Sequence, residues 1–386
     1  MAAPSSRETV DRRLLGLDLA RGVAALAVLV YHVDFMFGLR KALVPGGYTA
    51  VDLFFVLSGF VIAKTYEGDI RSGRIGAFGV ASRRLARLYP LYALTLLVGV
   101  VVMTARFHSN FGRIDAPAIA VAAFANLFVA PTPIAVFGGE ALFPFNAASW
   151  SIFYELAVNA VFFVVFARLN TRGLVCLWLA SGIGLAFVAI RFAGVDVGWG
   201  APNVLAGFPR VCFSFLSGML VWRRYQVRPW TAPVWALAAL IAVHLALMQL
   251  KLWIPASLVA WSDLAIVAVL APAIVSVGVG ATLGPLIGRI GSFLGDISYA
   301  VYLTQDALII AAAGFTQAVL GAKIYDFAPI AGLLFVPLCV AESYFVYRWF
   351  EAPARAWLRR ASGSRRAARQ AAALSPVALS NAPQDG

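Results

Sequence analysis

The sequence contains few charged residues and few cysteines. Charged side chains make up only 13% of its 386 residues and 61% of the residues are hydrophobic, whereas about a quarter of the residues in a soluble globular protein are charged. This composition excludes an ordinary soluble domain. Cys176, Cys212 and Cys339 lie far apart inside apolar segments, without a C-x-x-C pair. The spacing argues against a disulfide framework and against a zinc site, and we expect no bound metal.

The charge that is present is mostly positive. The net charge is +13, which in a soluble protein would suggest a nucleic-acid partner. Here the basic residues lie mostly between apolar runs, a pattern typical of membrane orientation. We therefore expect membrane lipid, and no nucleic acid, as a partner. The apolar run that begins at Leu14 extends past Val33 without a convincing cleavage site, so we interpret it as a retained span and not as a signal peptide.

Ten apolar runs have the length of membrane spans, which require about 20 residues of helix. They fall near 14–35, 48–64, 88–105, 149–167, 173–192, 204–222, 230–250, 255–279, 292–312 and 328–348. An eleventh run, 117–131, is shorter and is followed by a stretch rich in proline and glycine. If it does not span and the N-terminus is cytoplasmic, most basic residues lie inside; if it spans, most lie outside, against the positive-inside tendency.

The sequence therefore predicts an all-α integral membrane protein. We expect a polytopic bundle of about ten transmembrane helices plus one short re-entrant or interfacial segment at 117–131. Residues 1–13 form a cytoplasmic N-terminus, 14–360 the transmembrane domain and 361–386 a disordered cytoplasmic tail, because the last segment lacks a periodic apolar face. The sequence leaves the oligomeric state open.

Ionisable residues inside spans are costly unless they face the bundle interior, so each is a functional candidate. Arg21 and His32 are eleven residues apart on the first span, which places them on one helical face about 16 Å apart in depth. Asp52 enters the second, antiparallel span at a depth similar to that of His32. A carboxylate-oriented histidine suits proton transfer near neutral pH, and the alternative is a structural hydrogen bond between helices.

Two further groups of polar residues lie near span ends. Arg84 and Arg87 share one helical face at the predicted cytoplasmic surface, where a phosphate-bearing ligand would suit their bidentate geometry; topological anchoring or contact with anionic lipid is the alternative. Trp150 opens the fourth predicted span and fits an aromatic belt. Glu155, about one turn deeper, is expected near His32 and Asp52, where it would bind acceptor hydroxyls or tune the histidine.

Several motifs together resemble the acyltransferase-3 family of membrane O-acyltransferases. In chain order they lie at 17–32, 47–60, 84–90, 149–155, 297–303 and 351–353. The first includes an Arg-x10-His spacing, and the fourth resembles a Trp-Ser-x-x-x-Glu element. The resemblance covers about Leu17 to Arg360. One departure is Gln305, which stands two residues after the Tyr302-Leu303 pair, where the family commonly has a histidine.

The resemblance implies a role for each of these positions. It implies that His32 is the catalytic base and Asp52 its partner, and that Arg84 and Arg87 bind acyl-CoA, with Arg21 along the path of the thioester arm. Glu155, Trp150, Tyr302 and Gln305 are the expected acceptor-binding residues. It further implies acyl-CoA, commonly acetyl-CoA, as co-substrate, and a carbohydrate or glycoconjugate acceptor at the bacterial cytoplasmic (inner) membrane.

Three interpretations compete at this stage. In the first, the acceptor oxygen attacks the acyl carbon directly, with His32 as base; transfer through Ser58 ranks lower because no neighbour in sequence identifies a base for it. In the second, the chain is a multi-span transporter with a relay of Arg21, His32, Asp52 and Glu155. In the third, it is a structural membrane protein. The sequence does not identify the acceptor or the acyl chain.

Overall fold

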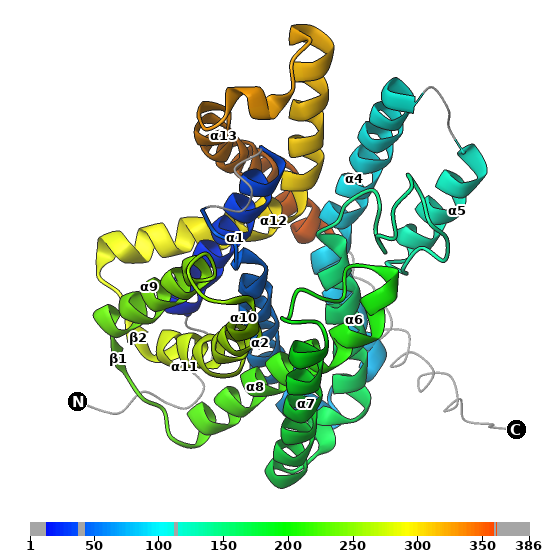
Figure 1. Ribbon diagram of the computed structural model, residues 1–386. Helices are drawn as coiled ribbons and strands as arrows, with labels where there is room; N and C mark the ends of the chain where they lie inside the picture. Colours follow the sequence, from blue (N-terminus) through cyan, green and yellow to red (C-terminus); the bar gives the residue numbers. More distant parts are fainter. Residues whose placement is uncertain (1–12, 38–42, 112–114, 359, 361–386) are drawn as a thin grey trace, which may run out of the picture.

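A computed structural model describes residues 13–37, 43–111, 115–358 and 360. Residues 1–12 of the expected N-terminal segment 1–13 and the tail 361–386 lie outside the described residues, as does Lys41. The described chain is a helical bundle (Figure 1). Its α-helices are α1 (Leu15–Met36), α2 (Ala50–Ile62), α3 (Gly68–Arg71), α4 (Ala77–Phe111), α5 (Ala116–Leu127), α6 (Ser149–Val164), α7 (Thr171–Arg191), α8 (Gly207–Val227), α9 (Val234–Leu250), α10 (Ala256–Ala265), α11 (Ala271–Gly280), α12 (Pro285–Leu320) and α13 (Ile330–Val346).

Shorter elements connect or extend these helices. The 3-10 turns are η1 (Gly47–Thr49), η3 (Phe166–Arg168), η4 (Ala201–Ala206) and η6 (Ile324–Phe327), and the π-helical turns are η2 (Ala63–Glu67), η5 (Ile266–Leu270) and η7 (Tyr347–Glu351). The strands β1 (Ala232–Pro233) and β2 (Ala281–Thr282) form one short parallel pair. Because η2, η5 and η7 continue neighbouring helices, α2 reaches Arg71, α10 joins α11, and α13 extends to Leu358 as long helical segments.

Eight helical segments in the described part of the chain are long and apolar enough to cross a membrane. All ten predicted spans form helices, but two are shorter than expected. The runs 149–167 and 230–250 form α6 and α9, of 16 and 17 residues, which at 1.5 Å per residue reach about 24–26 Å against a core of about 30 Å. The helical membrane class agrees with the prediction, whereas the count of ten is reduced to eight helices of full span length.

The short run 117–131 enters and leaves the bundle at one end of α4. It forms α5, of 12 residues. The carbonyl of Leu127, at the end of α5, accepts a hydrogen bond of 2.9 Å from the Tyr89 hydroxyl. The chain then turns back, and Phe137 packs on Phe107 with ring centroids 5.2 Å apart, about 27 Å further along α4 than Tyr89. The segment therefore returns toward the end of α4 at which it began, and its assignment as re-entrant or interfacial stays a prediction.

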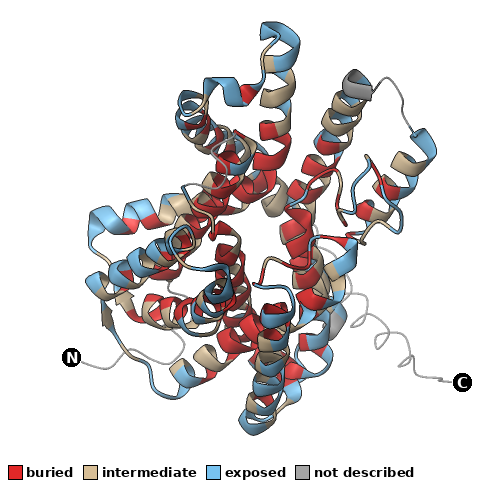
Figure 2. Ribbon diagram, in the orientation of Figure 1, coloured by how far each residue is buried: buried red, intermediate tan, exposed pale blue. Residues whose placement is uncertain are grey.

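The bundle core lies where α1 and α2 meet their neighbours. α1 packs along α12, α2 packs along α8, and α4 and α6 lie beside them. Buried residues line the inward faces of these helices, while exposed apolar residues cover the outward faces, as expected when lipid is the solvent (Figure 2). The α2–α8 crossing is close because Gly59 and Gly218 lack side chains: a Cβ at either would lie 1.9 Å from a backbone oxygen of the other helix.

Polar contacts sort the connecting segments into two ends of the bundle. At one end, Arg71 donates hydrogen bonds to the carbonyls of Ala167 and Leu169, and Arg223 pairs with Glu67. At the opposite end, the loop at 140–142 bonds to the loop at 199–201. These connecting segments therefore gather at two opposite ends of the bundle.

Candidate active site

A cavity of about 340 Å³ opens between α1, α2, α4, α6, α12 and the extension of α13. Four arginines line it, and we call it the arginine cavity: Arg21, Arg84, Arg87 and Arg355. Its other walls are largely apolar or aromatic and come from Phe54, Phe55, Leu57, Val61, Leu88, Ile152, Tyr299, Tyr302 and Tyr347. Arg21, Arg84 and Arg87, predicted to share a ligand, therefore face one cavity.

The carboxylates of the arginine cavity are held by arginines. Glu155 is ion-paired with Arg84, and Glu351 with Arg355 at 2.8 Å. Asp296 pairs with Arg13 at 2.7 Å, outside the lining. By contrast, no carboxylate in the described part of the chain lies within ion-pair distance of Arg87, and its guanidinium interacts with Glu155 only at longer range. A cavity arginine without a carboxylate partner is suited to an anionic ligand.

Arg21 is fixed against α12. Its guanidinium donates to the Ser298 hydroxyl at 3.0 Å and to the Gly295 carbonyl at 2.6 Å, and it pairs with Asp18 at 3.0 Å. His32 also meets α12, because its Nδ1 lies 3.9 Å from Oδ1 of Asp306. The prediction that Arg21 and His32 share one face of the first span is therefore confirmed.

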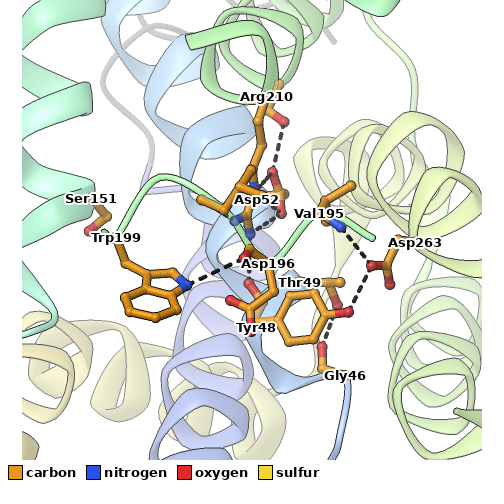
Figure 3. A network of polar contacts seen from close by, with 12 residues as sticks. Gly46, Tyr48, Thr49, Asp52, Ser151, Val195, Asp196, Trp199, Arg210 and Asp263 are labelled. Atoms are coloured by element: carbon orange, nitrogen blue, oxygen red, sulfur yellow. Dashed lines mark hydrogen bonds and ion pairs between the residues drawn. The ribbon is translucent and has the colours of Figure 1, made fainter. Parts of the chain in front are cut away.

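The predicted pairing of His32 with Asp52 is wrong. Asp52 is fully buried and accepts three hydrogen bonds of 2.7–3.0 Å from the guanidinium of Arg210 on α8 (Figure 3). Arg210 donates its remaining hydrogen bonds to the carbonyls of Val197 and Tyr48. The charge of Asp52 is thus committed to Arg210, because a buried arginine requires a partner that satisfies its donors.

These contacts form a sealed polar cluster, which we call the Arg210 network: Tyr48, Asp52, Val197, Arg210 and Ser214. Both charged side chains at its centre have no exposed surface. The network ties α2 and α8 to the loop that carries Asp196 and Trp199 (Figure 3). It does not contribute to the lining of the arginine cavity.

The predicted position of Glu155 beside His32 and Asp52 is also wrong. Glu155 lines the arginine cavity, where it pairs with Arg84 and accepts a 2.9 Å hydrogen bond from the hydroxyl of Ser58. Ser58 lies six residues beyond Asp52 on α2, about 9 Å deeper along the helix. The carboxylate faces the arginines because α6 brings it, two turns from its start, against α4 and α2.

The remaining predicted residues divide between the two regions. Tyr302 lines the arginine cavity and its hydroxyl lies 2.8 Å from that of Ser151. Trp150 lies beside the Arg210 network, with the Arg210 guanidinium 5.3 Å from its ring centroid. Gln305 is fully buried, donates to the carbonyl of Tyr302 at 3.0 Å and lies outside the cavity lining. Acceptor contact by Trp150, Tyr302 and Gln305 stays a prediction.

Helix geometry places His32 just beyond the arginine cavity. Tyr302 lines the cavity, and Asp306 lies four residues further on the same face of α12, about 6 Å along the axis. Asp306 is held there by a 2.9 Å hydrogen bond from the backbone amide of Ala148, three residues before the cavity-lining Ser151. The His32 imidazole therefore lies about one helical turn past the Tyr302–Ser151 pair.

Sequence reasoning missed three residues of this arrangement. Arg210 and Asp306 are ionisable residues inside predicted spans, so the rule that singled out Arg21 and His32 applied to both. Arg355 follows the last span, where it was counted only as a cytoplasmic charge. Its position four residues after Glu351, one turn away, was a signal for the ion pair that lines the cavity.

Comparison with known proteins identifies the family. A family model described as an acyltransferase domain matches residues 14–348. The chain belongs to the acyltransferase-3 family. Membership places the chain among the acyltransferases. The match covers all the residues that line the arginine cavity except those beyond 348, which are Glu351, Ala352 and Arg355. No solved structure matches the chain.

Three similar proteins illustrate the range of the acyltransferase-3 relatives. Protein 2 in the picA locus of Rhizobium radiobacter is 36% identical over 193 residues, which cover 48% of this chain and 99% of that protein. The O-acetyltransferase OatA of Staphylococcus aureus (strain NCTC 8325 / PS 47) is 34% identical over 92 residues, which cover 24% of this chain and 14% of OatA. A putative O-acetyltransferase of Staphylococcus aureus (strain COL) is 36% identical over 91 residues, or 22% of this chain and 14% of that protein.

Proposed function

We propose that this acyltransferase transfers an acyl group, with acetyl as the first candidate, from acyl-CoA to a hydroxyl group of a carbohydrate or glycoconjugate in the bacterial inner membrane or at the cell surface. The observation that carries the proposal is the arginine cavity, which joins an anion-binding end to the neighbourhood of His32. The O-acetyltransferase names of the staphylococcal relatives support oxygen as the acceptor atom and acetyl as the group.

The donor end lies at Arg87 and its neighbours. The phosphates of acyl-CoA are dianionic or monoanionic groups that suit guanidinium donors. Arg87 has no carboxylate partner among the described residues, and Arg84 and Arg355 add positive charge nearby. The thin thioester arm then follows the apolar walls of the cavity past Arg21 and Tyr302. On this path the thioester approaches His32, while the phosphates stay with the arginines.

The reaction centre lies between the Tyr302–Ser151 pair and His32. The acceptor oxygen attacks the thioester carbonyl carbon as His32 takes the hydroxyl proton. The carbon–sulfur bond then breaks, and the thiol of CoA leaves with that proton, so the products are the ester and free CoA. Histidine suits this step because it accepts and returns a proton near neutral pH. Direct transfer requires no intermediate on the protein.

A test uses the purified full-length chain in liposomes with acetyl-CoA and an oligosaccharide acceptor. Release of free CoA is followed with a thiol reagent, and the acylated sugar is identified by mass spectrometry. We expect CoA release that depends on the acceptor. Uptake of solute without CoA turnover would overturn the proposal in favour of a transporter.

The variant His32→Ala tests the proposed base. We expect it to insert and fold, since it makes α1 more apolar, and to lose transfer by a factor of about 10² to 10⁴, the usual contribution of a general base. His108→Ala, which changes a histidine outside the arginine cavity, is the control and is expected to keep the parent's activity. A His32→Ala protein with the parent's rate would disprove the assignment.

A further inference from the structure

We propose that Asp306 is the residue that positions His32 and stabilises its protonated form, in place of Asp52. The inference rests on the proposed function, because it assigns a partner to the proposed base. Among the residues that the structure describes, Asp306 is the carboxylate within ion-pair distance of His32, at 3.9 Å from Nδ1. Asp52 is excluded by the hydrogen bonds that commit both its oxygens to Arg210.

Asp306 is anchored independently of the histidine. Its Oδ2 accepts the 2.9 Å hydrogen bond from the amide of Ala148, at the start of α6, while Oδ1 points toward His32. The side chain is mostly buried. One oxygen therefore fixes the carboxylate between α12 and α6, and the other is left for the imidazole. Because one oxygen is fixed by the Ala148 amide, the carboxylate has one orientation, and this orientation favours one direction of the imidazole ring.

The distance between the two groups fits a partner that acts during the reaction. A separation of 3.9 Å is too long for a hydrogen bond, and Nδ1 of His32 is buried without another hydrogen-bond partner. Catalytic contacts often tighten only when the reacting complex forms. When Nε2 takes the acceptor's proton, the imidazolium and the carboxylate attract each other across a short distance in a weakly polar interior. The attraction between His32 and Asp306 is therefore strongest after His32 has taken the proton.

The placement also orients the reactive nitrogen. If Nδ1–H faces Asp306, then Nε2 is the nitrogen that receives the proton. A carboxylate that fixes the tautomer in this way keeps Nε2 unprotonated and available at the start of the reaction. Asp306 touches neither substrate in this arrangement, so it is a positioning residue and not a catalytic one.

The sharpest test is Asp306→Asn. The amide oxygen of asparagine still accepts the Ala148 hydrogen bond, but the negative charge is lost. We expect kcat to fall by about 100-fold, the upper range for loss of the carboxylate that orients a metal-binding histidine, while KM for acetyl-CoA stays near the parent's. Asp306→Ala should lose the same factor in kcat and also unfold at lower temperature, because the Ala148 amide is left without its acceptor.

A matched control is Asp34→Asn. Asp34 is likewise buried and accepts backbone amides, those of Leu43 and Val44, and its asparagine variant is expected to keep kcat near the parent's. An Asp306→Asn protein with the parent's kcat, or one whose KM and folding stability change while kcat does not, would overturn the inference. A fully active His32→Ala protein would contradict the proposed function itself. If His32→Ala is inactive but Asp306→Asn keeps the parent's kcat, only the assignment of Asp306 is wrong.

Discussion

The arginine cavity and the Arg210 network both pair arginines with carboxylates inside the bundle. They differ in how far the charged side chains are exposed and in whether each arginine has a carboxylate partner. In the network, Arg210 and Asp52 have no exposed surface, and Asp52 accepts three hydrogen bonds from the guanidinium. In the cavity, the side chain of Glu155 is 21% exposed and that of Arg355 is 25% exposed, and Arg87 has no carboxylate partner among the described residues.

The difference shows that burial and complete hydrogen bonding distinguish charged residues with a structural role from those available to a ligand. A sealed pair in which each guanidinium nitrogen donates a hydrogen bond is unavailable to a ligand and holds helices in place. A pair that borders open space, next to an arginine without a partner, can rearrange when an anion enters. Asp52 in the network and Glu155 in the cavity both lie in predicted spans, so this signal identifies candidates without telling the two roles apart.

The largest expected effect is a difference in reagent access between the two ends of the bundle, because the arginine cavity is predicted to open to the cytoplasm and the opposite end to face the outside of the cell. With Cys176, Cys212 and Cys339 replaced, Gly139→Cys and Lys323→Cys should react with a membrane-impermeant thiol reagent in intact cells, because both belong to the end of the bundle opposite the arginines. Arg224→Cys should react only after lysis. All three positions are exposed in the structure. The reverse pattern would place the cavity's arginines outside and exclude donor entry from the cytoplasm.

A large effect on stability is expected in the Arg210 network. Arg210→Met leaves the buried carboxylate of Asp52 without its ion-pair partner, with only the Ser214 hydroxyl still donating to it, which costs about 3–5 kcal/mol in the free energy of unfolding. The double variant Arg210→Met with Asp52→Leu removes both charges and should recover most of this loss. Thermal unfolding in detergent measures both. A single variant as stable as the double one would contradict the structural role of the pair.

A smaller effect, on binding alone, is expected in the arginine cavity. Arg87→Ala removes the arginine without a carboxylate partner, and KM for acyl-CoA should rise by about tenfold, as for loss of one charged hydrogen bond. The unfolding temperature and kcat should change little, because no internal ion pair is broken. Arg83→Ala, an exposed arginine of the same segment outside the cavity lining, is the control. Equal changes in both variants would indicate a general effect of surface charge.

Much of the fold follows from local properties of the chain. Long apolar runs predict helices, since a backbone in lipid satisfies its own hydrogen bonds, and all ten predicted runs are helical. Run 117–131 was predicted not to span from its length and from the charge distribution, and it forms only the 12-residue α5. The count of ten full-length spans is not confirmed, because α6 already ends at Val164 and α9 begins only at Val234, and composition does not specify where loops take over from helices.

The candidate site was predicted in part. Eleven residues of helix place Arg21 and His32 on one face whatever surrounds them, and Arg84 and Arg87 face one cavity for the same reason. Partners on other helices were not predictable in this way. Asp52 was assigned to His32 from its depth and from the family resemblance, and Glu155 from its depth. Depth does not give the rotation of one helix against another.

Composition, helical period and the cost of charge in lipid are local properties, and they are enough to predict a helical membrane protein with arginines and a histidine facing its interior. Which charges meet depends on how the helices pack. The close α2–α8 crossing at Gly59 and Gly218 brings Asp52 to Arg210, and the packing of α1 on α12 brings His32 to Asp306. Those pairings depend on the relative rotation and register of helices that are far apart in the chain. The packing of the whole bundle sets both.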